Sequence, residues 1–317
     1  MLKIKVPQDE LRFYDTKLAR NVLNAFQALA MDEMRYSFQP AVWEKPAGLS
    51  TVCGYLMTSL DLLTIFQNLK QVWFPGVHSN IGGGEAEQEL QDITLAWMMS
   101  QMREACHIEF DEDYVQHIFG PKAPVPNYRN WSCGLIDTSN NSWFYKIAGT
   151  HHVRTPGQYF AVNGETGRAV HDPPHSKFPR PLENTQERIH SSVRTRLLRG
   201  PGINDKGRYL AEALTPHRWH NWNGPPRHGW TCETIQSEED IELAVESQRS
   251  FPNEERAQFL WRSTGKNANR GRLLDEESTI KYPKVLIEDV LGYYEKMLRA
   301  RDVSVTGVWD KIPAQFS

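Results

Sequence analysis

The chain has 317 residues, of which 39% are hydrophobic and 24% are charged, a composition typical of a soluble globular protein that can bury a sizeable core. A formal net charge of -3 provides no general attraction to nucleic acid or to anionic membranes, so neither is a predicted partner. The four cysteines are far apart without a CxxC pair, and the first residues form no apolar leader, so we expect free thiols, no zinc site and a cytoplasmic location by default.

The N-terminal part is predicted to alternate helices and strands. Apolar residues at helical spacing predict a helix over residues 17–34, and a short strand is expected over 38–43. A second strand is expected over 72–74, followed by a helix that begins near Gln88. This alternation predicts an α/β fold, with a parallel sheet covered by helices.

Residues 49–67 are strongly apolar but show no clear helical stripe. The segment is too short and too polar for a membrane span, so we interpret it as a buried crossover helix and predict no transmembrane segment.

His78 is the first candidate for catalysis. Pro75-Gly76 ends the apolar strand just before it, so the side chain is expected at the carboxyl end of a strand, where α/β proteins place their chemistry. The glycine run 82–84 permits backbone angles that leave room beside the imidazole. A histidine there suits a general base near neutral pH, although a purely structural histidine remains the alternative.

A general base needs a nucleophile and an orienting acid. Glu44, Asp92 and Asp32 are the candidate acids; each could instead be structural, Asp92 through the dipole at the start of its helix. The sequence contains no Gly-x-Ser-x-Gly nucleophile elbow. The nearest string surrounds Ser132, but it lacks the first glycine and follows the histidine, so Ser132 is not predicted to be the nucleophile.

A proline-rich stretch at 120–127 marks a boundary, and we divide the chain into residues 1–110 and a mixed or helical extension, 111–317. Residues 187–198 are compatible with a helix or a strand. The other elements predicted for the extension are a strand over 143–149 and helices over 238–250, 252–262 and 283–301.

Two clusters in the extension have alternative interpretations. Eight of the eleven histidines fall between residues 151 and 228, but no carboxylates accompany their pairs at ligand spacing, which favours loop histidines over a metal site. The basic stretch 188–199 could meet phosphate, but without interleaved aromatic residues it is interpreted as a solvated, partly buried amphipathic face. No cofactor is predicted.

Residues 25–46 and 68–101 resemble the α/β-hydrolase domain of the type VI secretion phospholipase effectors. The second string carries the strongest likeness, with FPGVHS, the triple glycine and DITLAW. Strings at 154–159, 188–197 and 288–298 resemble the extension of fungal-type members. The resemblance implies the C-terminal part of an α/β-hydrolase sheet followed by that extension, with His78 as the triad histidine of a serine hydrolase. It also implies that the substrate is a lipid or small-molecule ester.

The chain departs from this pattern in two ways. It lacks the elbow and the family's aspartate strand, so we expect the nucleophile segment to be missing and the chain alone to be inactive. The alternatives are a non-catalytic interaction module or pseudoenzyme, and a metal-dependent hydrolase. In addition, residues 52–67 lengthen a connection that is much shorter in similar sequences, and their coding options resemble intron boundaries, so we hypothesise a retained intron there.

Overall fold

The fold is taken from a computed structural model. The structure describes residues 16–19, 21–35, 38–45, 67–120, 123, 130–136, 138, 152–163, 169–171, 174, 179–215, 229–248, 251, 254–264, 285–302 and 311–313.

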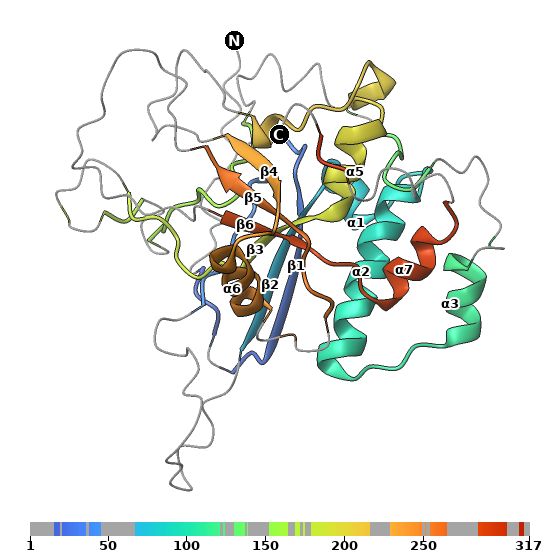
Figure 1. Cartoon of the computed structure of the whole chain (residues 1–317), viewed down its shortest axis with the longest axis horizontal. Coiled ribbons are helices and arrows are strands. Elements are labelled where there is room, and N and C mark those ends of the chain that lie inside the picture. Colours follow the sequence, from blue (N-terminus) through green and yellow to red (C-terminus); the bar gives the residue numbers. More distant parts are fainter. Residues whose placement is uncertain are drawn as a thin grey trace, which may run out of the picture.

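A six-stranded mixed sheet organises the described residues, in the order β1-β2-β3-β6-β5-β4 (Figure 1). The strands are β1 (Asn24–Ala30), β2 (Asn68–Phe74), β3 (Glu187–His190), β4 (Trp230–Thr234), β5 (Phe259–Ser263) and β6 (Val285–Asp289). The first four strands in the sheet order are parallel, and β5 and β4 continue the sheet antiparallel. The predicted α/β class is confirmed, and the single sheet takes strands from both sides of residue 110.

The register of β1 and β2 determines where the site is located. Asn24 pairs with Asn68 at one end, and Ala30 pairs with Phe74 at the other. Both strands therefore end together, and the residues that follow them meet at the carboxyl edge of the sheet.

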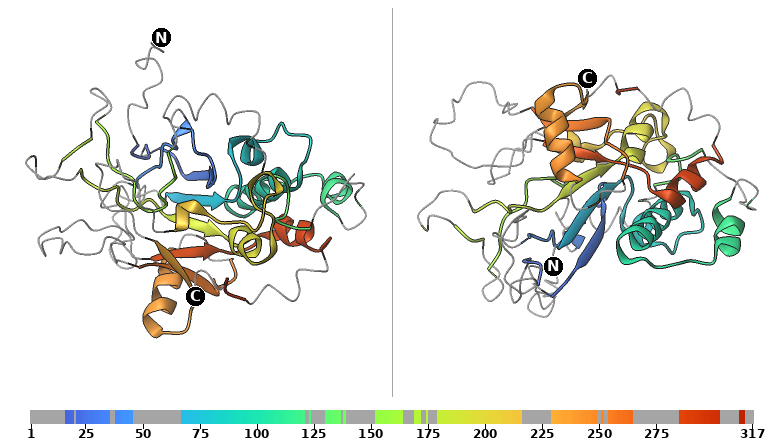
Figure 2. Two further views of the ribbon diagram at one scale, coloured as in Figure 1. Left: turned by 90° about the horizontal axis from the view of Figure 1, so that it is seen from above. Right: turned by 60° about the horizontal axis from the view of Figure 1, so that its bottom comes forward.

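The helices are α1 (His78–Gly82), α2 (Glu89–Cys106), α3 (Glu112–Phe119), α5 (Ser191–Arg199), α6 (Glu238–Ser247) and α7 (Tyr293–Arg299), with 3₁₀ turns η2 (Ile203–Asp205) and η3 (Glu212–Leu214). Helices α2, α7 and α3 gather on one side of the sheet, whereas α6 lies beside β4 and β5 (Figures 1 and 2). Gly292 makes the contact between α2 and α7 close, because a Cβ there would lie 2.4 Å from the Cβ of Ser100.

Large aromatic side chains fill the interior between the sheet and its helices. Trp73 on β2, Trp97 on α2 and Trp261 on β5 are fully buried. The Phe74 ring meets Trp97 edge-on, with ring centroids 5.4 Å apart, and it stacks on His190 at 4.4 Å. The end of β2, just before His78, is therefore held by packing from α2 and β3.

The helix predicted over 17–34 is wrong, because residues 24–30 form β1 instead. The alternation of half-buried and buried side chains in NAFQALA fits one helical stripe and also fits a strand beside β2. Seven pairs of residues with β2 decide in favour of the strand. The strand predicted over 38–43 is also wrong, since these residues form no strand and the next residue, Glu44, makes only an isolated bridge with Lys17.

The C-terminal predictions fail where a strand lies next to a helix or replaces one. The predicted helix 252–262 contains the start of β5, and the predicted helix 283–301 is β6 followed by α7. Residues 187–198, for which a helix or a strand was expected, contain β3 and then α5.

Three local predictions are confirmed and two others are not tested. The strand at 72–74 is the end of β2, the helix from Gln88 is α2, and α6 matches the helix predicted over 238–250. The predicted strand over 143–149 lies outside the described residues. The same holds for the predicted crossover helix over 49–67 and the hypothesised intron over 52–67, except for residue 67.

Candidate functional site

His78 begins α1 directly after the turn that ends β2. Gly76 makes this turn with a φ of 125°, a conformation that side chains rarely adopt. A Cβ at Gly76 would lie 2.6 Å from the Cβ of Asn80, so the turn also has no space for one. The Asn80 side chain accepts a hydrogen bond from the Val77 N–H (3.0 Å) and donates one to the Leu135 carbonyl (3.0 Å). The backbone that carries His78 is therefore tightly fixed.

Asp32 holds the same turn from the end of β1. Its carboxylate accepts a hydrogen bond from the Gly76 N–H (2.7 Å) and another from the Tyr209 hydroxyl (2.8 Å). Burial raises the pKa of Asp32 to about 6, although these two hydrogen bonds and Arg196 oppose the shift. The acid that the sequence placed at the end of a helix instead joins three distant segments beneath the His78 turn.

Glu33 supports His78 itself. The backbone N–H of His78 donates to the Glu33 carboxylate (3.2 Å), and Arg35 binds that carboxylate through its Nε at 2.7 Å. Burial works against ionisation of Glu33, but the hydrogen bonds from Arg35 outweigh it and lower the pKa of Glu33. Sequence reasoning missed this partner, since a buried Glu-x-Arg pair after an apolar strand is only a weak signal.

The imidazole of His78 is solvent-exposed, with the Phe38 ring beside it at a centroid distance of 5.1 Å. The Arg35 guanidinium in turn lies 3.8 Å from the centroid of the Phe38 ring. An exposed imidazole on a rigid turn is free to exchange protons with a bound molecule.

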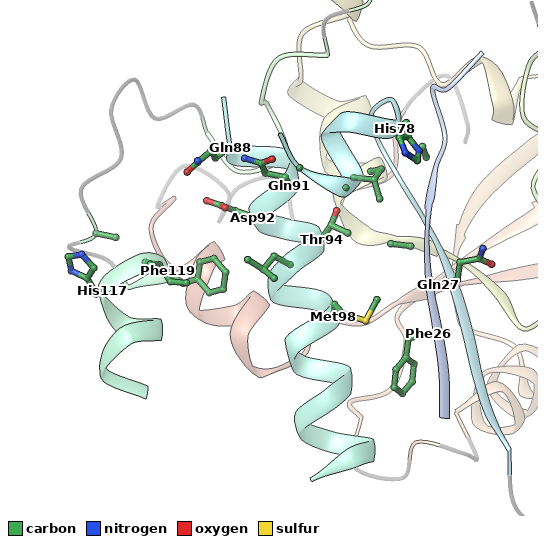
Figure 3. Close-up of a pocket in the computed structure, with 18 residues that line it drawn as sticks. Phe26, Gln27, His78, Gln88, Gln91, Asp92, Thr94, Met98, His117 and Phe119 are labelled. Carbon is green, nitrogen blue, oxygen red and sulfur yellow. The ribbon is translucent and has the colours of Figure 1, made fainter. Parts of the chain in front are cut away.

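A pocket of about 790 Å³ opens next to His78. Three residues from one face of β1, namely Phe26, Ala28 and Ala30, form one wall, and α2 forms the other. In Figure 3, Met98 and Phe26 lie between α2 and β1, on the same flank of α2 as His78. The opposite flank faces α3, and the pocket reaches Phe119 there.

Asp92 lines this pocket together with His78, but no hydrogen bond joins the two among the described side chains. Figure 3 shows the Asp92 carboxylate on the flank that faces α3. Burial raises the pKa of Asp92 to about 6, with Arg301 lowering it and Glu89 adding to the increase. Asp92 is therefore a pocket carboxylate that does not orient the imidazole in this structure.

Glu44 lies elsewhere. Its carboxylate binds the Arg180 guanidinium at 2.9 and 3.1 Å and accepts the Glu183 N–H at 2.8 Å. It does not line the pocket at His78. The Glu44 carboxylate therefore joins two connecting loops through these contacts.

Ser132 is fully buried, and its hydroxyl donates to the Ser192 carbonyl (2.5 Å). Beside it lies a buried chain of hydrogen bonds at the end of β3. The Ser192 hydroxyl lies 2.6 Å from His190 Nδ1, and His190 Nε2 lies 2.6 Å from the Glu295 carboxylate. All three side chains are fully buried, so this chain of bonds holds α7 against β3 and has no described opening for a substrate.

The basic stretch 188–199 is not a solvated face. Arg188, Arg194 and Arg196 are buried, and Arg194 forms an ion pair with Glu288 at 2.9 Å. Arg196 donates to the carbonyls of Ser132 and Gly134. These arginines bind carboxylates and backbone carbonyls inside the protein.

Within the part of the chain that the structure describes, no group of three or more His, Cys, Asp or Glu side chains is arranged to hold a metal ion. Most of the histidine pairs weighed for a metal fall outside that part. Likewise, none of the described helices is long and apolar enough to cross a membrane.

Fold and site together define an α/β protein with an exposed histidine at the carboxyl edge of its parallel strands. Residues 1–101 match the family model described as "T6SS, Phospholipase effector Tle1-like, catalytic domain", and the resemblance drawn from the sequence is confirmed for this part of the chain. Searches of curated proteins and of solved structures returned no match.

Proposed function

We propose that the pocket beside His78 is the histidine end of a lipase- or phospholipase-like site for carboxylic ester hydrolysis. The observation that carries this proposal is the exposed His78 imidazole at the mouth of a largely apolar pocket, on a turn fixed by Asp32 and Glu33. The match of residues 1–101 to a phospholipase effector catalytic domain supports the same activity.

In the proposed reaction, His78 takes the proton of the attacking hydroxyl and then donates it to the leaving alcohol. No nucleophile is assigned on this chain, because its sequence lacks the elbow and Ser132 and Ser192 are buried. The orienting acid remains a prediction: Asp92 shares the pocket with His78, whereas Glu44 is engaged with Arg180.

A p-nitrophenyl ester and a fluorophosphonate probe test the expectation that this chain does not supply the nucleophile. We expect no turnover above background by this chain alone, no effect of His78→Ala, and no labelled serine. Turnover that His78→Ala abolishes, together with one labelled serine, would show that the chain carries its own nucleophile.

Two other functions make different predictions. A non-catalytic interaction module or pseudoenzyme would bind a partner and would not hydrolyse the ester, even when a serine elbow is supplied on a second polypeptide. A metal-dependent hydrolase would hydrolyse the ester without a labelled serine and would lose activity with a chelator.

A further inference from the structure

The pocket beside His78 extends over two flanks of α2, one towards β1 and one towards α3. Below His78, the flank between α2 and β1 is lined by apolar side chains, among them Phe26, Ala28 and Met98 (Figure 3). The flank that faces α3 carries the polar side chains of Gln88, Gln91 and Asp92, with the Phe119 ring beyond them. His78 lies at the upper end of the flank between α2 and β1, so it would meet the carbonyl of an ester whose chain filled that flank (Figure 3).

The pocket lining itself carries no permanent cation, although Arg301 is close enough to lower the pKa of Asp92. No lysine or arginine is among the described residues that line it, and Asp92 is its only carboxylate. Asp92 is half-buried, so its charge acts on a bound group with less screening than that of a fully exposed carboxylate. The two basic residues nearby bind groups of the protein itself. Arg35 binds Glu33, and Arg301 donates to the carbonyls of Gly120 and Ile118.

We propose that this pocket selects esters by the charge of their alcohol portion. The acyl chain lies between α2 and β1, an uncharged or cationic alcohol portion lies over Asp92, and an anionic portion is disfavoured. The assignment of the ester carbonyl to His78 rests on the proposed function; the charge preference rests on the lining of the pocket.

The experiment compares decyltrimethylammonium, decyl maltoside and decyl phosphate, which share one alkyl chain. Binding to the full chain is measured by calorimetry at about pH 8, below micelle formation, where Asp92 is ionised. We expect the cationic and neutral probes to bind more tightly than decyl phosphate. Asp92→Asn should reduce the ratio of the decyl phosphate Kd to the decyltrimethylammonium Kd about fivefold.

Two controls separate charge from fold. Asp113→Asn removes an exposed carboxylate from the first turn of α3, outside the pocket lining, and should leave the ranking unchanged. Ala28→Phe should weaken binding of all three probes by filling the wall of β1. If that variant fails to fold, Leu95→Glu provides another test, because it adds a negative charge at a pocket residue that is already 47% exposed. It should increase the ratio of the decyl phosphate Kd to the decyltrimethylammonium Kd.

Decyl phosphate binding as tightly as the other probes, or a ranking insensitive to both Asp92→Asn and Leu95→Glu, overturns the charge preference. Failure of the proposed function has a different signature. If His78 proves chemically inert while the probes keep their ranking, the ester chemistry is wrong and the charge preference stands.

Discussion

Asp32 and Glu33 are neighbours in the chain but support the His78 turn in different ways. Asp32 accepts the Gly76 N–H under the turn, and Glu33 accepts the N–H of His78 itself. The sequence alone could place His78 after a strand, because Pro75 and Gly76 are local signals. It could not pair either acid with the turn, since each hydrogen bond spans more than forty residues of chain.

The raised pKa of Asp32 predicts a specific pH dependence of stability. The native state holds this proton more tightly than the unfolded chain, so the contribution of Asp32 is fully present below about pH 4 and is lost as pH rises through about 6. The loss amounts to about 3 kcal/mol. Urea unfolding measured between pH 4 and pH 7 gives the free energy of unfolding at each pH. Asp32→Asn should remove the part of its pH dependence that comes from Asp32.

Asp92 titrates in the same range and serves as the comparison. Asp92→Asn should remove its own part of the slope and leave that of Asp32. A wild-type slope that survives Asp32→Asn unchanged would contradict the burial of an ionisable Asp32.

Among the elements, those with strong local patterns were predictable and those defined by distant partners were not. The helix α2 is amphipathic over its own length, and β2 ends at a proline and a glycine. The strand β1 has a sequence that also suits a helix, and only its pairing with β2 decides. The arginines of α5 look solvated in the sequence because their partner Glu288 lies 94 residues away.

The attachment of α7 to the sheet gives a prediction at this scale. Glu295 accepts hydrogen bonds from His190 Nε2 (2.6 Å) and from the Gly292 N–H (2.8 Å). Glu295→Ala leaves the buried His190 Nε2 and the half-buried Gly292 N–H without this partner, which should lower the free energy of unfolding by about 3 kcal/mol. Glu242→Ala, at an exposed position of α6, should change it by less than about 0.5 kcal/mol in the same denaturant titration.

In the whole molecule, a buried group of four charges links three parallel strands and a loop. Lys70 on β2 and Arg188 on β3 both pair with Asp289 on β6, at 2.9 and 2.8 Å, and both also pair with Glu254. Burial alone would raise the pKa of Asp289, but Lys70 and Arg188 lower it to about 2. The four charges cancel, so the sheet core holds them as a neutral set.

Asp289→Asn should destabilise the protein by about 3–5 kcal/mol at neutral pH, because it leaves two buried cations underpaired. The lowered pKa means that the contribution of Asp289 is present above about pH 4 and is lost as pH falls towards 2, so the variant should also show a shallower acid transition. Acid and urea unfolding followed by tryptophan fluorescence test both effects. An equal loss in Asp113→Asn, an exposed carboxylate, would contradict the assignment to the buried group.

In the proposed function, an acyl chain bound in the pocket brings its ester to His78 at the mouth. A long-chain alkyl chloromethyl ketone tests this most directly, because the bound chain presents an alkylating carbon to the imidazole, which displaces chloride. After the exposed Cys106 is blocked, peptide mass spectrometry should find His78 modified well ahead of His107, which is also exposed but lies outside the pocket. Ala28→Phe should abolish this preference. Modification of His78 no faster than that of His107, or a preference that Ala28→Phe leaves unchanged, would show that a chain bound in the pocket does not reach His78.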